Sequence, residues 1–71
     1  MQFDHSKLLG RIIEKFGSQR ALCAHIGWTE SKLSARINNQ VQFDADEMYL
    51  LAGKDVLDIP VEEFAAYFFA V

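Results

Sequence analysis

Apolar residues recur at helical spacing between Ser6 and Phe16, and this pattern predicts the first helix of the chain. The apolar positions share one wide face and are Leu8, Leu9, Ile12, Ile13 and Phe16. Asp4 or Ser6 can cap the start of this helix, and Gly17 ends it. Basic residues recur every four positions on the other side, at Lys7, Arg11 and Lys15. That row is either a solvated face or a set of contacts with DNA phosphate.

Two shorter helices joined by a glycine turn are predicted within residues 19–38. Ser18 can cap the first of them, because its hydroxyl accepts an amide hydrogen of the opening turn. The apolar residues of this helix share one face and are Leu22, Cys23 and Ile26. Gly27 follows, where a left-handed residue is needed to end the helix. The pattern therefore predicts a helix, a tight turn and a second helix.

The second of these helices has an apolar stripe and a polar outer surface. Thr29 can cap it, and Trp28 can pack on Leu33 as a hydrophobic staple. With Leu33 and Ile37 pointing inward, small or polar residues point outward or flank that surface. They are Glu30, Ser31, Lys32, Ser34, Ala35 and Asn38. A helix that lies close in the major groove of DNA needs such a face.

A strong helix start follows a polar loop that ends near Gln42. The Asn and Gln residues of that loop either serve the loop or reach DNA. Asp44 can cap the next helix while Glu47 reaches back to it, and Phe43 can pack on Met48. The buried face of this helix is predicted at Met48, Leu51 and Ala52.

Gly53 is expected to stop that helix, and Pro60 is expected to open the last one, over residues 61 to about 69. The whole pattern predicts an all-α fold of four or five short helices. At 71 residues, the chain is expected to form one domain, 1–71, near the lower limit for a core of its own.

The helix-turn-helix stretch resembles the Cro and CI repressor class of phage proteins, which have a lambda-repressor-like domain. The matching positions are Gln19, Ala21, Leu22, Cys23, Ile26, Gly27, Trp28, Leu33 and Asn38. The chain departs from that class at Arg36, usually apolar, and at Asn39, usually Gly. Three further segments are similar to the short Cro-like or modulator-of-repression proteins of Gram-positive temperate phages. They are residues 6–22, 34–40 and 59–69.

This resemblance implies a regulator of a phage or prophage switch that binds an operator in double-stranded DNA. The expected DNA-binding residues are Gln19, Arg20, Thr29, Glu30, Ser31, Lys32, Ser34, Ala35, Arg36, Asn38, Asn39 and Gln40. By the resemblance, Gln19 and Asn38 hold phosphate. Ser31 is expected to reach a base edge and Ala35 a thymine methyl group, and Glu30 either accepts from cytosine or caps the helix.

Charge is distributed unevenly along the chain, whose formal net charge is −3. Residues 1–43 carry +3 and residues 44–71 carry −6. Local potential governs attraction to phosphate more than total charge does. The basic first part and the polar helix face favour DNA. The acidic pI of about 5.1 and the aromatic tail favour the alternative, a protein-interaction module that binds a phage repressor and changes its DNA occupancy.

The end of the chain holds more apolar groups than one stripe of a terminal helix needs. The candidate interface residues are Phe64, Tyr67, Phe68 and Phe69. They either form a homodimer contact, hold another protein such as the repressor, or close the core. A single helix-turn-helix reads about one half-site, so a DNA-binding version needs a two-fold partner.

Other chemistry is not indicated. His5, Cys23 and His25 do not have the spacing of a metal site, and no cofactor motif is present. Glu62 and Glu63 are adjacent and diverge, so they do not form an acid and base pair; an enzyme is not expected. The single cysteine is typical of a reducing compartment, and no membrane span or signal peptide is evident. Together with the resemblance to phage proteins, this implies the cytoplasm of a bacterial host.

Overall fold

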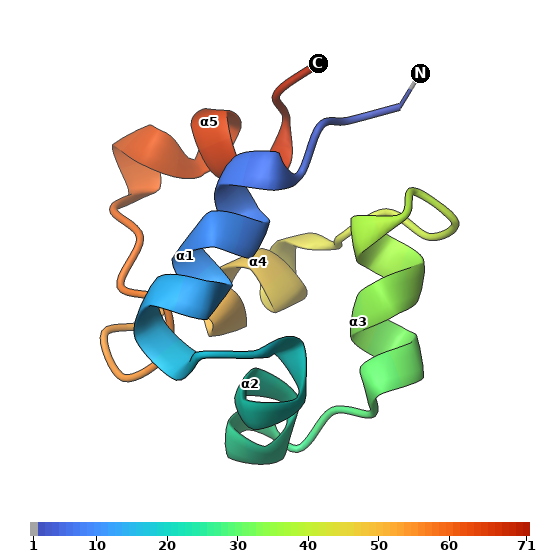
Figure 1. Cartoon of the computed structure of the whole chain (residues 1–71). Coiled ribbons are helices and arrows are strands. Elements are labelled where there is room, and N and C mark those ends of the chain that lie inside the picture. The colour runs from blue at the N-terminus through green and yellow to red at the C-terminus, as the bar shows by residue number, and fades with distance from the viewer. Residues whose placement is uncertain (1) are drawn as a thin grey trace.

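The computed structural model describes residues 2–71, which form five α-helices, one short 3-10 helix and no strand (Figure 1). The elements are α1 (Ser6–Phe16), α2 (Gln19–Ile26), α3 (Glu30–Ile37), α4 (Ala45–Ala52), η1 (Val61–Glu63) and α5 (Phe64–Phe68). The predicted all-α fold of four or five short helices is confirmed. In Figure 1, the two ends of the chain lie near each other beside α5, and α2 lies at the opposite end of the molecule.

Local sequence signals set most of the helix ends. The hydroxyl of Ser18 accepts from the amide of Ala21 at 3.1 Å, and Gly17 and Gly27 end α1 and α2 with φ angles of 86° and 78°. These values lie in the left-handed region that Gly enters without strain. The hydroxyl of Thr29 accepts from the amide of Lys32 at 3.1 Å. All of these ends agree with the predictions.

The start of α4 is a reciprocal capping box. The carboxylate of Asp44 accepts from the amide of Glu47 at 2.8 Å, and the carboxylate of Glu47 accepts from the amide of Asp44 at 3.1 Å. At the start of α1 the arrangement differs from the prediction, because His5 occupies the cap position and makes no side-chain cap bond. The carboxylate of Asp4 instead accepts from the amide of Ser6 at 2.9 Å.

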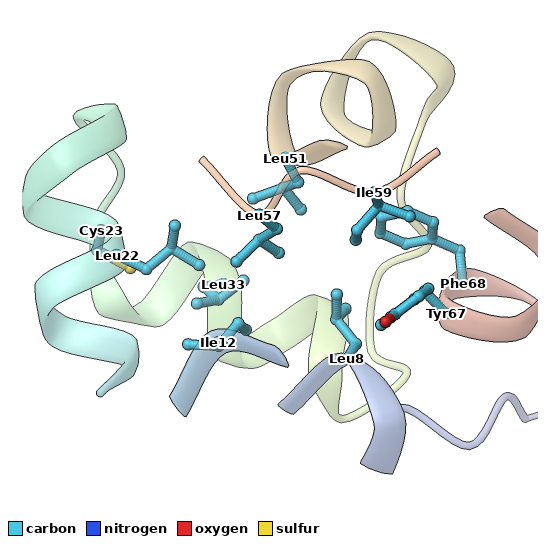
Figure 2. Packing of buried hydrophobic residues seen from close by; sticks show 10 residues of the cluster. All are labelled: Leu8, Ile12, Leu22, Cys23, Leu33, Leu51, Leu57, Ile59, Tyr67 and Phe68. Carbon is cyan, nitrogen blue, oxygen red and sulfur yellow. The ribbon is translucent and has the colours of Figure 1, made fainter. Parts of the chain in front are cut away.

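Helices α1 to α5 bury one continuous apolar core (Figure 2). Its buried residues are Leu8, Ile12, Leu22, Cys23, Leu33, Leu51, Leu57, Ile59, Tyr67 and Phe68. The predicted stripe of α1 is too wide, because Ile13 points outward and is 54% exposed. Leu57 and Ile59 enter the core from a segment that the sequence suggested only as a connection.

That segment, residues 53–60, is held by backbone bonds to the end of α4 and by a side chain of α1. The amide of Leu57 donates to the carbonyl oxygen of Leu51 at 3.0 Å, and the amide of Ile59 donates to the carbonyl oxygen of Ala52 at 3.1 Å. From α1, Arg11 donates to the carbonyl oxygens of Leu57 at 2.8 Å and of Asp58 at 2.9 Å. Arg11 therefore binds this segment to α1, and its guanidinium is not directed outward to contact phosphate.

The last helix begins differently from the prediction. Residues 61–63 form a 3-10 turn, and the α-helix covers only Phe64–Phe68. Tyr67 and Phe68 are 7% and 1% exposed, so they belong to the core and leave no surface for a partner. The ring of Phe68 lies edge-on to that of Phe43, with the ring centres 5.2 Å apart. Of the four candidate interface residues, only Phe69 is exposed, at 46%, and Phe64 is half-buried.

Candidate functional site

The turn between α2 and α3 fixes these two helices at close range. The carbonyl of Cys23 accepts from the amides of Gly27 at 2.8 Å and Trp28 at 3.0 Å, which closes the end of α2. The thiol of Cys23 lies 3.6 Å from the carbonyl oxygen of Thr29. A small residue at Cys23 therefore allows the start of α3 to lie directly against α2.

An open, shallow hollow lies along the outer side of α3. Its lining residues come from α2, α3 and the loop that follows, and they are Gln19, Glu30, Ser31, Ser34, Ala35, Asn38 and Gln40. Seven of the twelve expected DNA-binding residues thus lie together. The side-chain amide of Asn38 donates to the hydroxyl of Ser34 at 3.1 Å. Glu30 is the one charged side chain in this lining. We call these seven residues the α3 hollow.

Arg36 lies outside the α3 hollow, at the contact between α3 and α4. Its Nε and Nη2 atoms donate to the two carboxylate oxygens of Glu47, each at 2.9 Å. Its Nη1 atom donates to the carbonyl of Lys32 at 3.1 Å. The hydrogen bonds lower the pKa of the Glu47 carboxyl and raise the pKa of Arg36. The guanidinium is therefore engaged within the chain, which argues against its expected role at DNA.

Lys32 and Thr29 also have partners within the chain. The ammonium of Lys32 lies 4.4 Å from the centre of the Trp28 ring and 3.9 Å from a carboxylate oxygen of Glu47. Thr29 uses its hydroxyl as the cap of α3. Arg20 is on α2, next to the α3 hollow in sequence but not part of its lining. Of these three, Arg20 is the one whose side chain has no polar or ring partner among residues 2–71.

Asn39 turns away from the α3 hollow. Its φ angle of 64° is left-handed, the conformation that Gly would adopt at this position and that Asn tolerates. Its side-chain oxygen accepts from the amide of Phe3 at 2.9 Å, and its side-chain nitrogen donates to the carbonyl of Phe3 at 2.8 Å. The residue expected at DNA therefore binds the N-terminal segment to the loop after α3.

Most of the basic side chains in the first half of the chain have partners within the chain. Arg11, Lys32 and Arg36 contact acceptors in the chain, and the ammonium of Lys7 lies 4.8 Å from the ring centre of Tyr67. Within residues 2–43, two basic side chains have no hydrogen bond, ion pair or ring contact. They are Lys15 and Arg20. Few of the basic side chains of this half can therefore contact phosphate without giving up a partner within the chain.

A second hollow, with a cavity volume of about 70 Å³, lies beside the N-terminal segment. It is lined by Phe3, His5, Asn39, Val41, Gln42, Phe43, Phe68 and Phe69. His5 is 6% exposed; its Nδ1 atom lies 3.0 Å from the carbonyl oxygen of Ile37, and its Nε2 atom has no partner among residues 2–71. No sequence pattern indicates this arrangement, because it joins segments more than thirty residues apart.

Metal binding and nucleophilic chemistry find no support in the described part of the chain. No three His, Cys, Asp or Glu side chains in residues 2–71 are grouped to hold a metal ion. Burial raises the pKa of the Cys23 thiol, which is 2% exposed. His25 is exposed on α2, beside the ring of Phe16. None of the helices in residues 2–71 has the length and apolarity required to span a bilayer.

Comparison with known proteins identifies a close structural relative. The solution structure of the modulator of repression of the temperate bacteriophage TP901-1 from Lactococcus lactis superposes with a TM-score of 0.83. The two chains are 33% identical, over 97% of this chain and 90% of that one. No curated protein matches this chain. The family described as protein of unknown function (DUF739) matches residues 1–71, so the chain belongs to this family and shares the fold of the phage modulator of repression.

Proposed function

We propose that this chain modulates repression in a temperate phage by binding the phage repressor and changing its occupancy of operator DNA. The observation that carries the proposal is the likeness to the TP901-1 modulator of repression, which extends over nearly all of both chains. The protein would act in the cytoplasm of the bacterial host, where repressor and operator meet. The sequence favoured direct DNA binding over this function, and we reverse that order.

The electrostatics of the chain support the reversal. Affinity for DNA depends on cations that neutralise phosphates and release counterions. Arg11 and Arg36 are held by acceptors of their own chain, and Lys32 lies over Trp28. Glu30 adds a negative charge to the α3 hollow itself. A protein partner does not require a surplus of free cations at this surface.

The test of the proposal is complex formation between this chain and the repressor of the same phage, measured by light scattering after size exclusion. We expect a stoichiometric complex of larger mass than either component. An unrelated helix-turn-helix repressor is the control and should elute unchanged. Separate elution of the two proteins at high micromolar concentration would refute the proposal.

Direct reading of an operator is the second candidate function, and the shape of the α3 hollow favours it. Ser31, Ser34 and Ala35 leave room for close approach, and Gln19 lies beside them as the resemblance to Cro-class proteins implies. In this hypothesis Ser31 contacts a base edge and Ala35 meets a thymine methyl group. A homodimer would be needed to read two half-sites.

The substitution Ala35→Glu tests direct operator binding by the chain. This change places a second carboxylate in the α3 hollow and should abolish operator binding by the chain, if such binding exists. DNA binding should also weaken with salt, with a slope of about −0.9 for each phosphate contacted. An affinity for operator that ignores both salt and Ala35→Glu would exclude α3 as a DNA-reading helix.

A further inference from the structure

Aromatic rings from three parts of the chain form the walls of the hollow of about 70 Å³ beside the N-terminal segment, which we call the N-terminal hollow. Phe3 lies edge-on to Phe69 with the ring centres 5.7 Å apart, and His5 lies edge-on to Phe43 at 5.6 Å. Phe43 in turn lies edge-on to Phe68 at 5.2 Å. The other lining residues are Asn39, Val41 and Gln42. Such walls suit a flat aromatic ring, because rings attract one another edge to face.

The N-terminal hollow is held in shape by hydrogen bonds and is open at the surface. The side chain of Asn39 accepts from the amide of Phe3 at 2.9 Å and donates to its carbonyl oxygen at 2.8 Å, which joins two of the walls. Val41 and Phe69, both in the lining, are 45% and 46% exposed. A small molecule can therefore enter from solvent while the fold stays intact.

The side chain of His5 supplies a polar group for this site. A carbonyl oxygen only accepts hydrogen bonds, so the Nδ1 atom, 3.0 Å from the carbonyl oxygen of Ile37, carries the proton of the neutral ring. Nε2 is then an acceptor, and none of residues 2–71 donates to it, although the side chain is only 6% exposed. Polar atoms buried in native proteins are nearly always paired. Nε2 therefore favours a ligand that carries an O–H or N–H donor.

A donor reaches Nε2 after one local movement, because this atom is shielded from solvent. The half-buried ring of Phe3 is beside it, with its centre 6.4 Å from that of His5. Asn39 holds Phe3 by its backbone alone, so the ring can turn outward while the segment stays in place.

Charge and size narrow the class of ligand further. With His5 neutral, no side chain in the lining carries a charge, and a charged molecule would lose its hydration there without gaining a counter-charge. An apolar cavity of about 150 Å³ holds a benzene ring. The N-terminal hollow has about half that volume, so it takes one ring with part of it at the surface.

We propose that the N-terminal hollow binds a small uncharged phenol, whose ring packs among the phenylalanine rings and whose hydroxyl donates to Nε2 of His5. The site shares no residue with the α3 hollow. The proposal is independent of the function proposed for the chain, because it needs neither the repressor nor DNA.

Nuclear magnetic resonance titration of the isotope-labelled full chain tests this proposal, with phenol as the probe. Phenol should shift the amide signals of the lining residues in a saturable way, and it should shift the Nε2 signal of His5. Anisole has the same ring without a donor and should bind about tenfold more weakly, since one net hydrogen bond is worth about that factor. Cyclohexanol, which lacks the aromatic ring, should also bind more weakly, and benzoate, which is charged, should not bind.

Two substitutions separate the polar and the apolar parts of the site. His5→Asn keeps a donor for the carbonyl oxygen of Ile37 and removes the acceptor, so the advantage of phenol over anisole should disappear. Val41→Trp fills the N-terminal hollow from an exposed position and should abolish binding of both. The matched control is Ile13→Trp, an exposed position on α1 outside the lining, which should keep the wild-type affinity.

Circular dichroism establishes that each variant is folded. If His5→Asn unfolds, the comparison of phenol with anisole in the wild type and the pair of tryptophan variants still decide the question. Shifts that rise in proportion to phenol without saturation, or equal affinities for phenol and anisole, would overturn the proposal. So would unchanged binding in Val41→Trp. Each of these results leaves the proposed action on the repressor standing.

Discussion

Removing the charge of Glu47 should destabilise the whole fold, because this buried carboxylate joins α4 to α3. Glu47 is 9% exposed and accepts from Nε and Nη2 of Arg36, each at 2.9 Å, and from the amide of Asp44 at 3.1 Å. Its partner Arg36 is held over the ring of Trp28. The substitution Glu47→Gln keeps the shape of the side chain but leaves a guanidinium without its counter-charge.

The size of the effect follows from this geometry. Breaking a fully buried ion pair costs about 3–5 kcal/mol, and a hydrogen bond to a charged group contributes about 1.5–3 kcal/mol. The side chains of Glu47 and Arg36 retain 11% and 15% exposure, so water compensates part of the loss. We expect a loss of about 2 kcal/mol in the free energy of unfolding. For a chain of this size that lowers the melting temperature by roughly 8–16 °C.

The same pair sets the acid stability. Because the bonds from Arg36 lower the pKa of Glu47 in the folded state, its stabilisation is present above the ordinary pKa of a glutamate. It is lost as the pH falls through the lower, folded-state pKa. The unfolding free energy of the wild type should therefore fall more steeply in acid than that of Glu47→Gln.

Urea denaturation at neutral and acid pH measures both effects, with the exposed Glu62→Gln as the matched control. A double-mutant cycle with Arg36→Met should give a coupling free energy of about 1–3 kcal/mol between the two residues. A Glu47→Gln variant as stable as Glu62→Gln at neutral pH, or a coupling near zero, would show that the pair does not stabilise the contact of α3 with α4.

Three other expectations concern the fold. Phe68→Ala should cost about 3–5 kcal/mol in urea denaturation because its ring is 1% exposed, and Phe69→Ala, at 46%, should cost below about 1 kcal/mol; equal losses would contradict the burial of Phe68. Gly10→Ala should raise the melting temperature, since no atom lies within 4 Å of the added methyl group, whereas Gly27→Ala should cost about 1–2 kcal/mol because its φ is 78°. The buried Cys23 thiol, whose pKa is raised, should react with a disulfide reagent only as fast as the chain unfolds; rapid modification under native conditions would show an open α2–α3 turn.

Signals that act over four or five residues predicted the helices well. The caps at Ser18, Thr29 and Asp44 and the glycine ends at Gly17 and Gly27 formed as expected. Each depends on a bond between neighbours, so the sequence alone contains the information needed. The last helix was less well predicted, since its first turn is a 3-10 turn.

Contacts between distant segments could not be predicted in this way. Arg36 and Glu47 are 11 positions apart, and Asn39 and Phe3 are 36 apart. Arg36 was expected at DNA as a basic residue of α3, and Asn39 as a polar residue of the loop that directly follows α3. Their partners, Glu47 and Phe3, lie in other segments of the chain, and no local sequence pattern reveals such pairs. Leu57 and Ile59 were missed as core residues for the same reason, since a loop has no periodic pattern.

The α3 hollow was predicted more successfully than the cations expected around it. Seven of the expected residues, chosen by helical phase, loop position or resemblance, do lie together. The position of a residue around a helix fixes the direction of its side chain, but it does not show whether the side chain has a partner in another segment. The sequence therefore predicted which residues lie on this surface, but not that most of the basic side chains expected beside them have partners within the chain.

A gel shift with labelled operator and the repressor of the same phage tests the central claim most directly, namely that the chain acts on the repressor. With repressor present at the concentration that shifts half of the operator, adding this chain should return the operator to the free position. The chain alone should leave the operator unshifted. A repressor band unchanged by a large excess of the chain, or a specific shift by the chain alone, would contradict the account.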